Sequence, residues 1–101
     1  MTVSKALLVR VEARPGKEAE VEGFLRGALP IVQGEPGTMP WFAVRMDERT
    51  FGIFDAFPDD AARQAHLAGG VGQALTARAD ELFVRPPEIE PLDVLASKLP
   101  G

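Results

Sequence analysis

The sequence predicts an α+β domain, in which helices cover one face of an antiparallel sheet. Three observations support this prediction. Residues 5–13 alternate between apolar and polar side chains, which is the period of a strand. Residues 17–32 repeat their apolar side chains at helical spacing. Residues 38–57 contain two apolar segments joined by a short polar connection, which is typical of a β-hairpin.

The first strand is predicted over Lys5–Ala13, and the turn Arg14-Pro15-Gly16 follows it. A helix then begins at Lys17, and its apolar face is built from Val21, Phe24, Leu25, Ala28 and Val32. Pro30 is expected to kink or end this helix, because proline cannot donate a hydrogen bond to the carbonyl four residues back.

The central hairpin is predicted from Thr38–Asp47 and Thr50–Phe57, with Glu48-Arg49 between them. A two-residue connection pairs Arg45 with Gly52, and Trp41 with Ala56. One face then carries Trp41, Ala43, Arg45, Gly52, Phe54 and Ala56. The other face carries Phe42, Val44, Met46, Phe51, Ile53, Asp55 and Phe57. Both faces therefore hold apolar side chains.

Two helices and a final strand are predicted for the rest of the chain. Pro58-Asp59-Asp60 is typical of a helix start, this helix ends near Gly69-Gly70, and a second helix runs until Pro86-Pro87. The last strand is Glu88–Lys98, in which Pro91 favours an edge position or the start of the strand. The order β-α-β-β-α-β is the ferredoxin-like plan, and we expect one such domain over residues 1–101.

The helices of this plan leave one face of the sheet open to water. A monomer would then expose either Trp41 and Phe54 or Phe42, Ile53 and Phe57, and apolar patches of this kind usually mark an interface. We therefore expect a homodimer in which two sheets pack on each other.

Composition excludes several classes of function. The formal net charge is −4 and no basic cluster is present, so nucleic-acid binding is not expected. No apolar run approaches the ~20 residues of a membrane span, and residues 1–13 lack the pattern of a signal peptide. With no cysteine and one histidine, no metal site is expected. The cytoplasm is the expected compartment.

The candidate chemistry lies in FGIFDAFPDDAARQAHLAGG, residues 51–70. His66 shares a helix face with Ala62, Ala65 and Gly69, so it either packs against a backbone carbonyl or faces a cavity. Its reference pKa of ~6.5 would let it accept a proton near neutral pH. Asp55 lies inside an apolar strand, where a carboxylate needs partners. It either orients His66 or binds a substrate hydroxyl, or it pairs with backbone amides or an arginine such as Arg63.

Two further side chains are candidates for ligand binding. Trp41 offers a flat face for stacking an aromatic ligand, although such a residue more often belongs to the core or to an interface. Arg45 shares its predicted face and could hold a phenolate or carboxylate, or reach an acid across the dimer.

The spacing in DAFPDDAARQAH resembles the antibiotic biosynthesis monooxygenase (ABM) family of dimeric α+β barrels. Many members carry an acid-x-aromatic at the end of the third strand and then a helical histidine, which here match Asp55, Phe57 and His66. The Arg-Pro-Gly turn and the G-T-x-x-W segment are also similar to the family. Phe57 stands where tryptophan is usual and the chain has no asparagine, so the residue set of haem-degrading relatives is incomplete and haem degradation is not expected.

The resemblance implies a cofactor-independent monooxygenase that oxidises a phenolic or hydroquinone-type substrate with O₂. For this chemistry we expect His66 to be the base, Trp41 and Phe57 to stack on the substrate, and Arg45 or Asp55 to hold its polar group. The sequence leaves one alternative open, a non-catalytic dimeric protein of the same fold that binds a small hydrophobic ligand or serves in a stress response.

Overall fold

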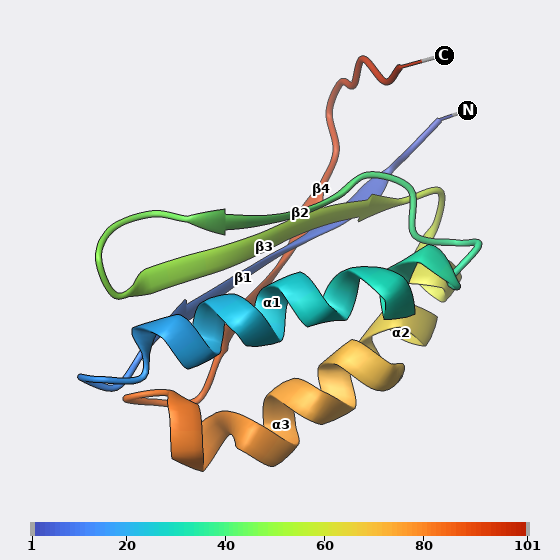
Figure 1. The fold of residues 1–101 in the computed structure, drawn as a ribbon. Helices are drawn as coiled ribbons and strands as arrows, with labels where there is room; N and C mark the ends of the chain where they lie inside the picture. The colour runs from blue at the N-terminus through green and yellow to red at the C-terminus, as the bar shows by residue number, and fades with distance from the viewer. Residues whose placement is uncertain (1, 101) are drawn as a thin grey trace.

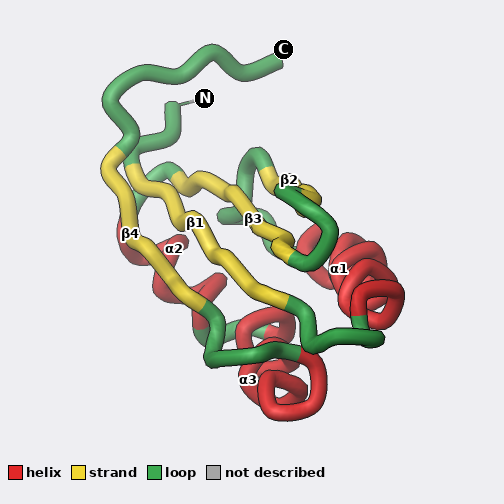
Figure 2. The backbone as a smooth tube through the Cα atoms, turned by 90° about the vertical axis from the view of Figure 1, so that its left-hand side faces the viewer, coloured by secondary structure: helices red, strands yellow, loops and turns green. Residues whose placement is uncertain are grey.

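The computed structural model describes residues 2–100 and has the predicted order of strands and helices (Figure 1). The elements are β1 (Lys5–Glu12), α1 (Glu18–Gln33), β2 (Trp41–Arg45), β3 (Thr50–Phe57), α2 (Asp60–Leu67), α3 (Gly70–Leu82) and β4 (Glu88–Asp93). The strands form one antiparallel sheet in the order β2-β3-β1-β4, and the helices lie on one face of it (Figures 1 and 2). The α+β, ferredoxin-like prediction is confirmed.

The main core lies between the sheet and the helices. The period-two side chains of β1 and β3 meet the apolar stripes of α1 and α3 there, and the central members are Val9, Val11, Val21, Leu25, Ala28, Phe51, Ile53, Val71 and Leu75. These are the faces that the periodicity of the sequence predicts, so hydrophobic burial determines how each element is turned.

Several element ends differ from the prediction, among them those of α1 and β4. Pro30 does not end α1, which continues to Gln33. Pro30 lies in the last turn of the helix, so only a few helical residues follow it. The N–H of Glu35 then donates to the carbonyl of Val32 at 2.9 Å, which extends the turn beyond the helix. The strand β4 ends at Asp93, opposite Lys5, where β1 begins, and one more backbone hydrogen bond follows, from the Val94 N–H to the Ser4 carbonyl at 2.9 Å. Pro91 lies on this edge strand, as expected.

The predicted register of the hairpin is wrong by one residue. Trp41 lies opposite Asp55. The N–H of Met46 donates to the carbonyl of Thr50 at 2.8 Å, so the connection consists of the three residues 47–49 instead of two. The carboxylate of Asp47 closes this longer loop by accepting the backbone N–H of Arg49 at 3.0 Å and that of Thr50 at 2.8 Å.

A shift of one residue exchanges the two faces of β2 relative to β3. Trp41 therefore shares the helix-facing side of the sheet with Asp55, Ile53 and Phe57, which are buried. The opposite side, here called the open sheet face, carries Leu8, Phe42, Val44 and Phe54. Phe42 is 57% exposed on that face. The open sheet face thus combines Phe42 from one predicted patch with Phe54 from the other. Neither predicted patch is present as a whole, but the hairpin does expose apolar side chains on one face.

The two chain ends lie beyond the same end of the sheet (Figures 1 and 2). A second, smaller core forms there from Val3, Ala6, Ala56, Met39, Leu92, Val94 and Leu99. Within residues 2–100, none of the helices is both long enough and apolar enough to cross a membrane.

Candidate functional site

The turn between β3 and α2 brings His66 and Asp55 together. Pro58 interrupts the strand, and Asp59 caps α2 by accepting the backbone N–H of Ala62 at 2.9 Å. The helix α2 packs against β1 and β3. His66 lies near the C-terminal end of α2, and its side chain contacts β3. The side chain of His66 is 8% exposed and that of Asp55 is 1% exposed.

Asp55 is the first acidic partner of His66. Its Oδ2 lies 2.8 Å from His66 Nε2, so the two buried side chains form an ion pair. Asp55 Oδ1 has no hydrogen-bond partner within residues 2–100. The alternative that Arg63 pairs with Asp55 is wrong, because the Arg63 guanidinium binds Asp60 and the carbonyls of Ala6 and Leu92.

Glu35 is the second acidic partner of His66, and it was not among the residues predicted from the sequence. Its Oε1 lies 2.5 Å from His66 Nδ1 and also accepts a hydrogen bond from Thr38 Oγ1 at 2.8 Å. Thr38 Oγ1 is itself 3.3 Å from the same ring nitrogen. Both residues belong to the connection between α1 and β2, so three separate segments of the chain meet at one imidazole.

The two acids determine the charge of His66. Burial is the largest single influence and lowers the pKa of His66, but the contacts with Asp55 and Glu35 and the charges of both acids together raise the pKa to about 9. The imidazole therefore holds its proton at neutral pH. The expectation that His66 is a free base near neutral pH is not met, because the reference pKa takes no account of two flanking carboxylates.

The two aromatic candidates lie beside this cluster. The ring of Phe57 is 5.3 Å from that of His66, at an interplanar angle of 44°, and Phe57 is completely buried. It supports the imidazole from the core side. Trp41 is half-buried opposite Asp55, and its indole Nε1 is buried with no hydrogen-bond partner in the described chain.

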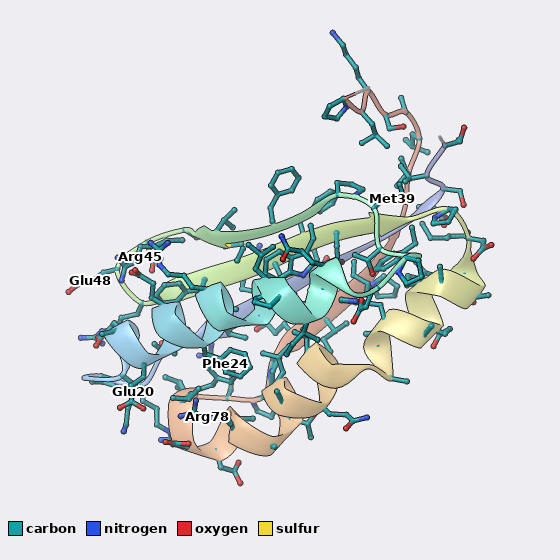
Figure 3. The ribbon with its side chains drawn as sticks, turned by 45° about the vertical axis from the view of Figure 1, so that its right-hand side comes forward. Glu20, Phe24, Met39, Arg45, Glu48 and Arg78 are labelled. Atoms are coloured by element: carbon teal, nitrogen blue, oxygen red, sulfur yellow. The ribbon has the colours of Figure 1, made fainter. Side chains whose placement is uncertain are left out.

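Arg45 lies away from His66. It lies at the end of β2 that is farther from Met39 (Figure 3). Arg45 is four residues along the strand from Trp41, a distance of about 13 Å. Its guanidinium lies 4.9 Å from the centre of the Phe51 ring and 3.7 Å from Glu22. Arg45 thus lines a separate groove between α1 and β2.

Two cavities touch His66 from different sides. The first has a volume of about 440 Å³ and lies between the sheet and α2 and α3; its walls include Leu7, Val9, Ile53, Leu67, Val71 and Leu75. We call it the sheet cavity. The second, also about 440 Å³, lies under the α1–β2 connection and is lined by Glu35, Thr38 and the start of α2 and α3. We call it the loop cavity.

The side chains around His66 include two carboxylates, which are possible metal ligands. Among residues 2–100, no three or more histidine, cysteine, aspartate or glutamate side chains are grouped so that they could hold a metal ion. The polar atoms around His66 thus form a charge cluster of one imidazole and two carboxylates.

No protein-family model matches the chain, and no curated protein does. Among solved structures, the NE2512 protein of unknown function from Nitrosomonas europaea is 50% identical, covers 98% of this chain and 96% of its own, and has a TM-score of 0.96. A candidate antibiotic biosynthesis monooxygenase from Caulobacter crescentus is 21% identical, with 93% and 92% covered and a TM-score of 0.78. Another candidate of that kind from N. europaea is 15% identical, with 91% and 99% covered and a TM-score of 0.79.

Proposed function

We propose that this protein oxidises a phenolic or hydroquinone-type aromatic substrate with O₂, without a metal or an organic cofactor. The chain belongs to the family of the N. europaea NE2512 protein and has the fold of the antibiotic biosynthesis monooxygenases. The observation that carries the proposal is the buried Asp55–His66 ion pair beside an apolar cavity in this fold.

The proposed reaction converts a phenol with a ring C–H and one O₂ into a quinone and one water. Loss of the hydroxyl proton gives a phenolate, which transfers one electron to O₂. The phenoxyl radical and superoxide join through a new C–O bond and take up a proton to give a hydroperoxide. Loss of water then breaks the O–O bond and the ring C–H bond. The substrate supplies all four electrons, so no other reductant is needed.

Asp55 and His66 divide the acid–base work in this proposal. Asp55 does not itself line the sheet cavity, but its neighbours Leu7 and Ile53 do. The proposal therefore requires a substrate hydroxyl to pass these side chains and donate its proton to Asp55 Oδ1, which is a free acceptor. The His66 imidazolium supplies positive charge in a water-poor place and stabilises the phenolate that remains. His66 is thus proposed as the charge that favours the anion rather than as the base.

The other candidates take different parts. Trp41, whose indole N–H has no partner, is proposed to contact the substrate next to Asp55, and Phe57 holds the imidazole from the buried side. Arg45 contacts Glu22 and Phe51 instead of this cluster, so it is not part of the proposed mechanism.

We also propose that the protein is a homodimer. The open sheet face presents Phe42, Val44 and Phe54, which are 57%, 43% and 37% exposed. Adjacent apolar side chains of this size favour burial against a second copy. Two sheets packed in this way would form the dimeric barrel that the resemblance implies.

Oxygen uptake tests the proposed function. Purified protein without added cofactor should consume O₂ with phenols and hydroquinones of increasing ring number. Asp55→Asn should lower the rate by ~10²–10⁴-fold, as expected for a lost proton acceptor. Glu22→Ala, at the Arg45 groove, is the control and should keep the rate. No uptake with any of these compounds, or equal rates in wild type and Asp55→Asn, would contradict the proposal.

One observation favours the alternative of a non-catalytic binding protein. Both ring nitrogens of His66 already contact protein carboxylates, as in a purely structural cluster. In that case the phenols would bind in the sheet cavity and no O₂ would be consumed.

A further inference from the structure

Both ring nitrogens of His66 contact a carboxylate. Nε2 contacts Asp55 at 2.8 Å and Nδ1 contacts Glu35 at 2.5 Å. An imidazolium has only these two N–H donors. A ligand in either cavity therefore meets only ring carbons as long as both carboxylates stay in place. To bind a nitrogen of His66, a ligand must displace one of the two acids.

The two acids differ in how easily they can leave. Asp55 is 1% exposed and lies within β3, where it pairs with both β1 and β2. Moving it would require the sheet to open. Glu35 is 21% exposed and lies in the segment between α1 and β2, outside the sheet and the helices. Its carboxylate can turn toward water without opening the sheet, so Glu35 is the exchangeable partner.

The place that Glu35 fills is suited to a carboxylate oxygen. Two donors converge on Glu35 Oε1, the Nδ1–H of His66 and the hydroxyl of Thr38 at 2.8 Å. The loop cavity adjoins this point, and its walls include Ile31, Pro36, Ala62, Ala65 and Gly70. Its volume of about 440 Å³ is in the usual range of small-ligand sites. The position of the Glu35 carboxylate thus adjoins the apolar walls of the loop cavity.

We infer that the loop cavity is a binding site for a small organic carboxylate, and that Glu35 is an internal occupant which this ligand displaces. The ligand carboxylate takes over the donors of His66 and Thr38, and its apolar body fills the cavity. One carboxylate replaces another, so the charge around His66 does not change. The inference goes beyond the proposed oxidation, because it needs only binding and concerns the other cavity.

The single histidine gives a direct test by NMR. Benzoate is titrated into wild type and Glu35→Ala at pH 7 and constant ionic strength, while the His66 ring ¹⁵N and C2-proton signals are followed. If Glu35 fills the site more than nine-tenths of the time, its removal should tighten benzoate binding by at least ~10-fold. Benzoate should shift Nδ1 more than Nε2.

Two controls make the result specific. Benzamide has the shape of benzoate without its charge and should not shift Nδ1 of Glu35→Ala. Glu22→Ala, which changes a glutamate of α1 that does not line the loop cavity, should bind benzoate as wild type does. Equal benzoate affinity in wild type and Glu35→Ala, or an equal response to benzamide, would overturn the inference.

A second variant covers the case in which Glu35→Ala does not fold. Glu35→Asp keeps the charge but is one methylene shorter, so it should compete less well and bind benzoate more tightly than wild type does. Unchanged affinity in Glu35→Asp would count against the inference. Oxygen uptake is not a readout in these experiments, so their failure is separate from a failure of the proposed oxidation.

Discussion

At the scale of the residue, the charge of His66 links stability to pH. The folded-state pKa of about 9 lies above the unfolded value of ~6.5, so folding takes up a proton between these values. The resulting stabilisation, up to about 3 kcal/mol, is fully present below pH 6.5 and is lost as the pH rises through 9. Urea unfolding of wild type and His66→Ala from pH 6 to pH 10 checks this. The difference between the two proteins should shrink as the pH rises, and a constant difference would contradict it.

Removal of His66 should also strand a buried charge. In His66→Ala, Asp55, which is 1% exposed in the wild type, loses its cation, so the free energy of unfolding should fall by roughly 3–5 kcal/mol at neutral pH. His66→Ala/Asp55→Asn should recover part of this loss, because the second change removes the uncompensated charge. Chemical denaturation of the single and double variants measures the coupling, and strictly additive losses would argue against the ion pair.

At the scale of the element, α2 and α3 approach each other closely just after His66. A Cβ at Gly72 would overlap the carbonyl oxygen of Leu67, which is backbone and cannot turn aside. Gly72→Ala should therefore lower the free energy of unfolding by about 1–3 kcal/mol. Gly23→Ala is the matched control, since nothing lies within 4 Å of its added Cβ, and it should stabilise α1 by up to about 1 kcal/mol. Thermal melts should separate the two variants in opposite directions.

The element scale also shows what periodicity can and cannot predict. Period two in β1 and β3 and helical spacing in α1 are sufficient to predict their buried faces, because hydrophobic burial acts on each element separately. The hairpin register depends on one residue in the connection, where the carboxylate of Asp47 stabilises a three-residue loop. Strand patterns do not report that local hydrogen bonding, so the facing of Trp41 was predicted wrongly.

The candidate site could be predicted in part for a related reason. Asp55 and His66 lie near each other in the sequence, and the turn at Pro58 brings them together. Glu35 is 31 residues from His66 and lies in an aperiodic Gly-Glu-Pro-Gly segment. Its pairing depends on where this connection lies after the layers pack, and so does the protonation of His66. A lone acid between glycines and proline was the only signal in the sequence.

At the scale of the whole molecule, the open sheet face predicts the assembly state. Light scattering should give about twice the chain mass of 10.9 kDa for wild type. Phe54→Asp should give a folded monomer, because Phe54 is 37% exposed on that face. Ile53→Asp, at 3% exposure in the core, should instead unfold the chain. A monomeric wild type, or a Phe54→Asp variant that stays dimeric, would contradict the sheet-on-sheet dimer.

The central claim, that the protein inserts one atom of O₂ into a phenol without a cofactor, is tested most directly by isotope labelling. Wild type is incubated with ¹⁸O₂ and an electron-rich naphthol, and the quinone is analysed by mass spectrometry. The proposal predicts one ¹⁸O atom in each quinone and the other in water, with product formation strongly reduced in Asp55→Asn. A quinone without ¹⁸O in its new carbonyl group, with water ruled out as an exchanging source, would contradict it.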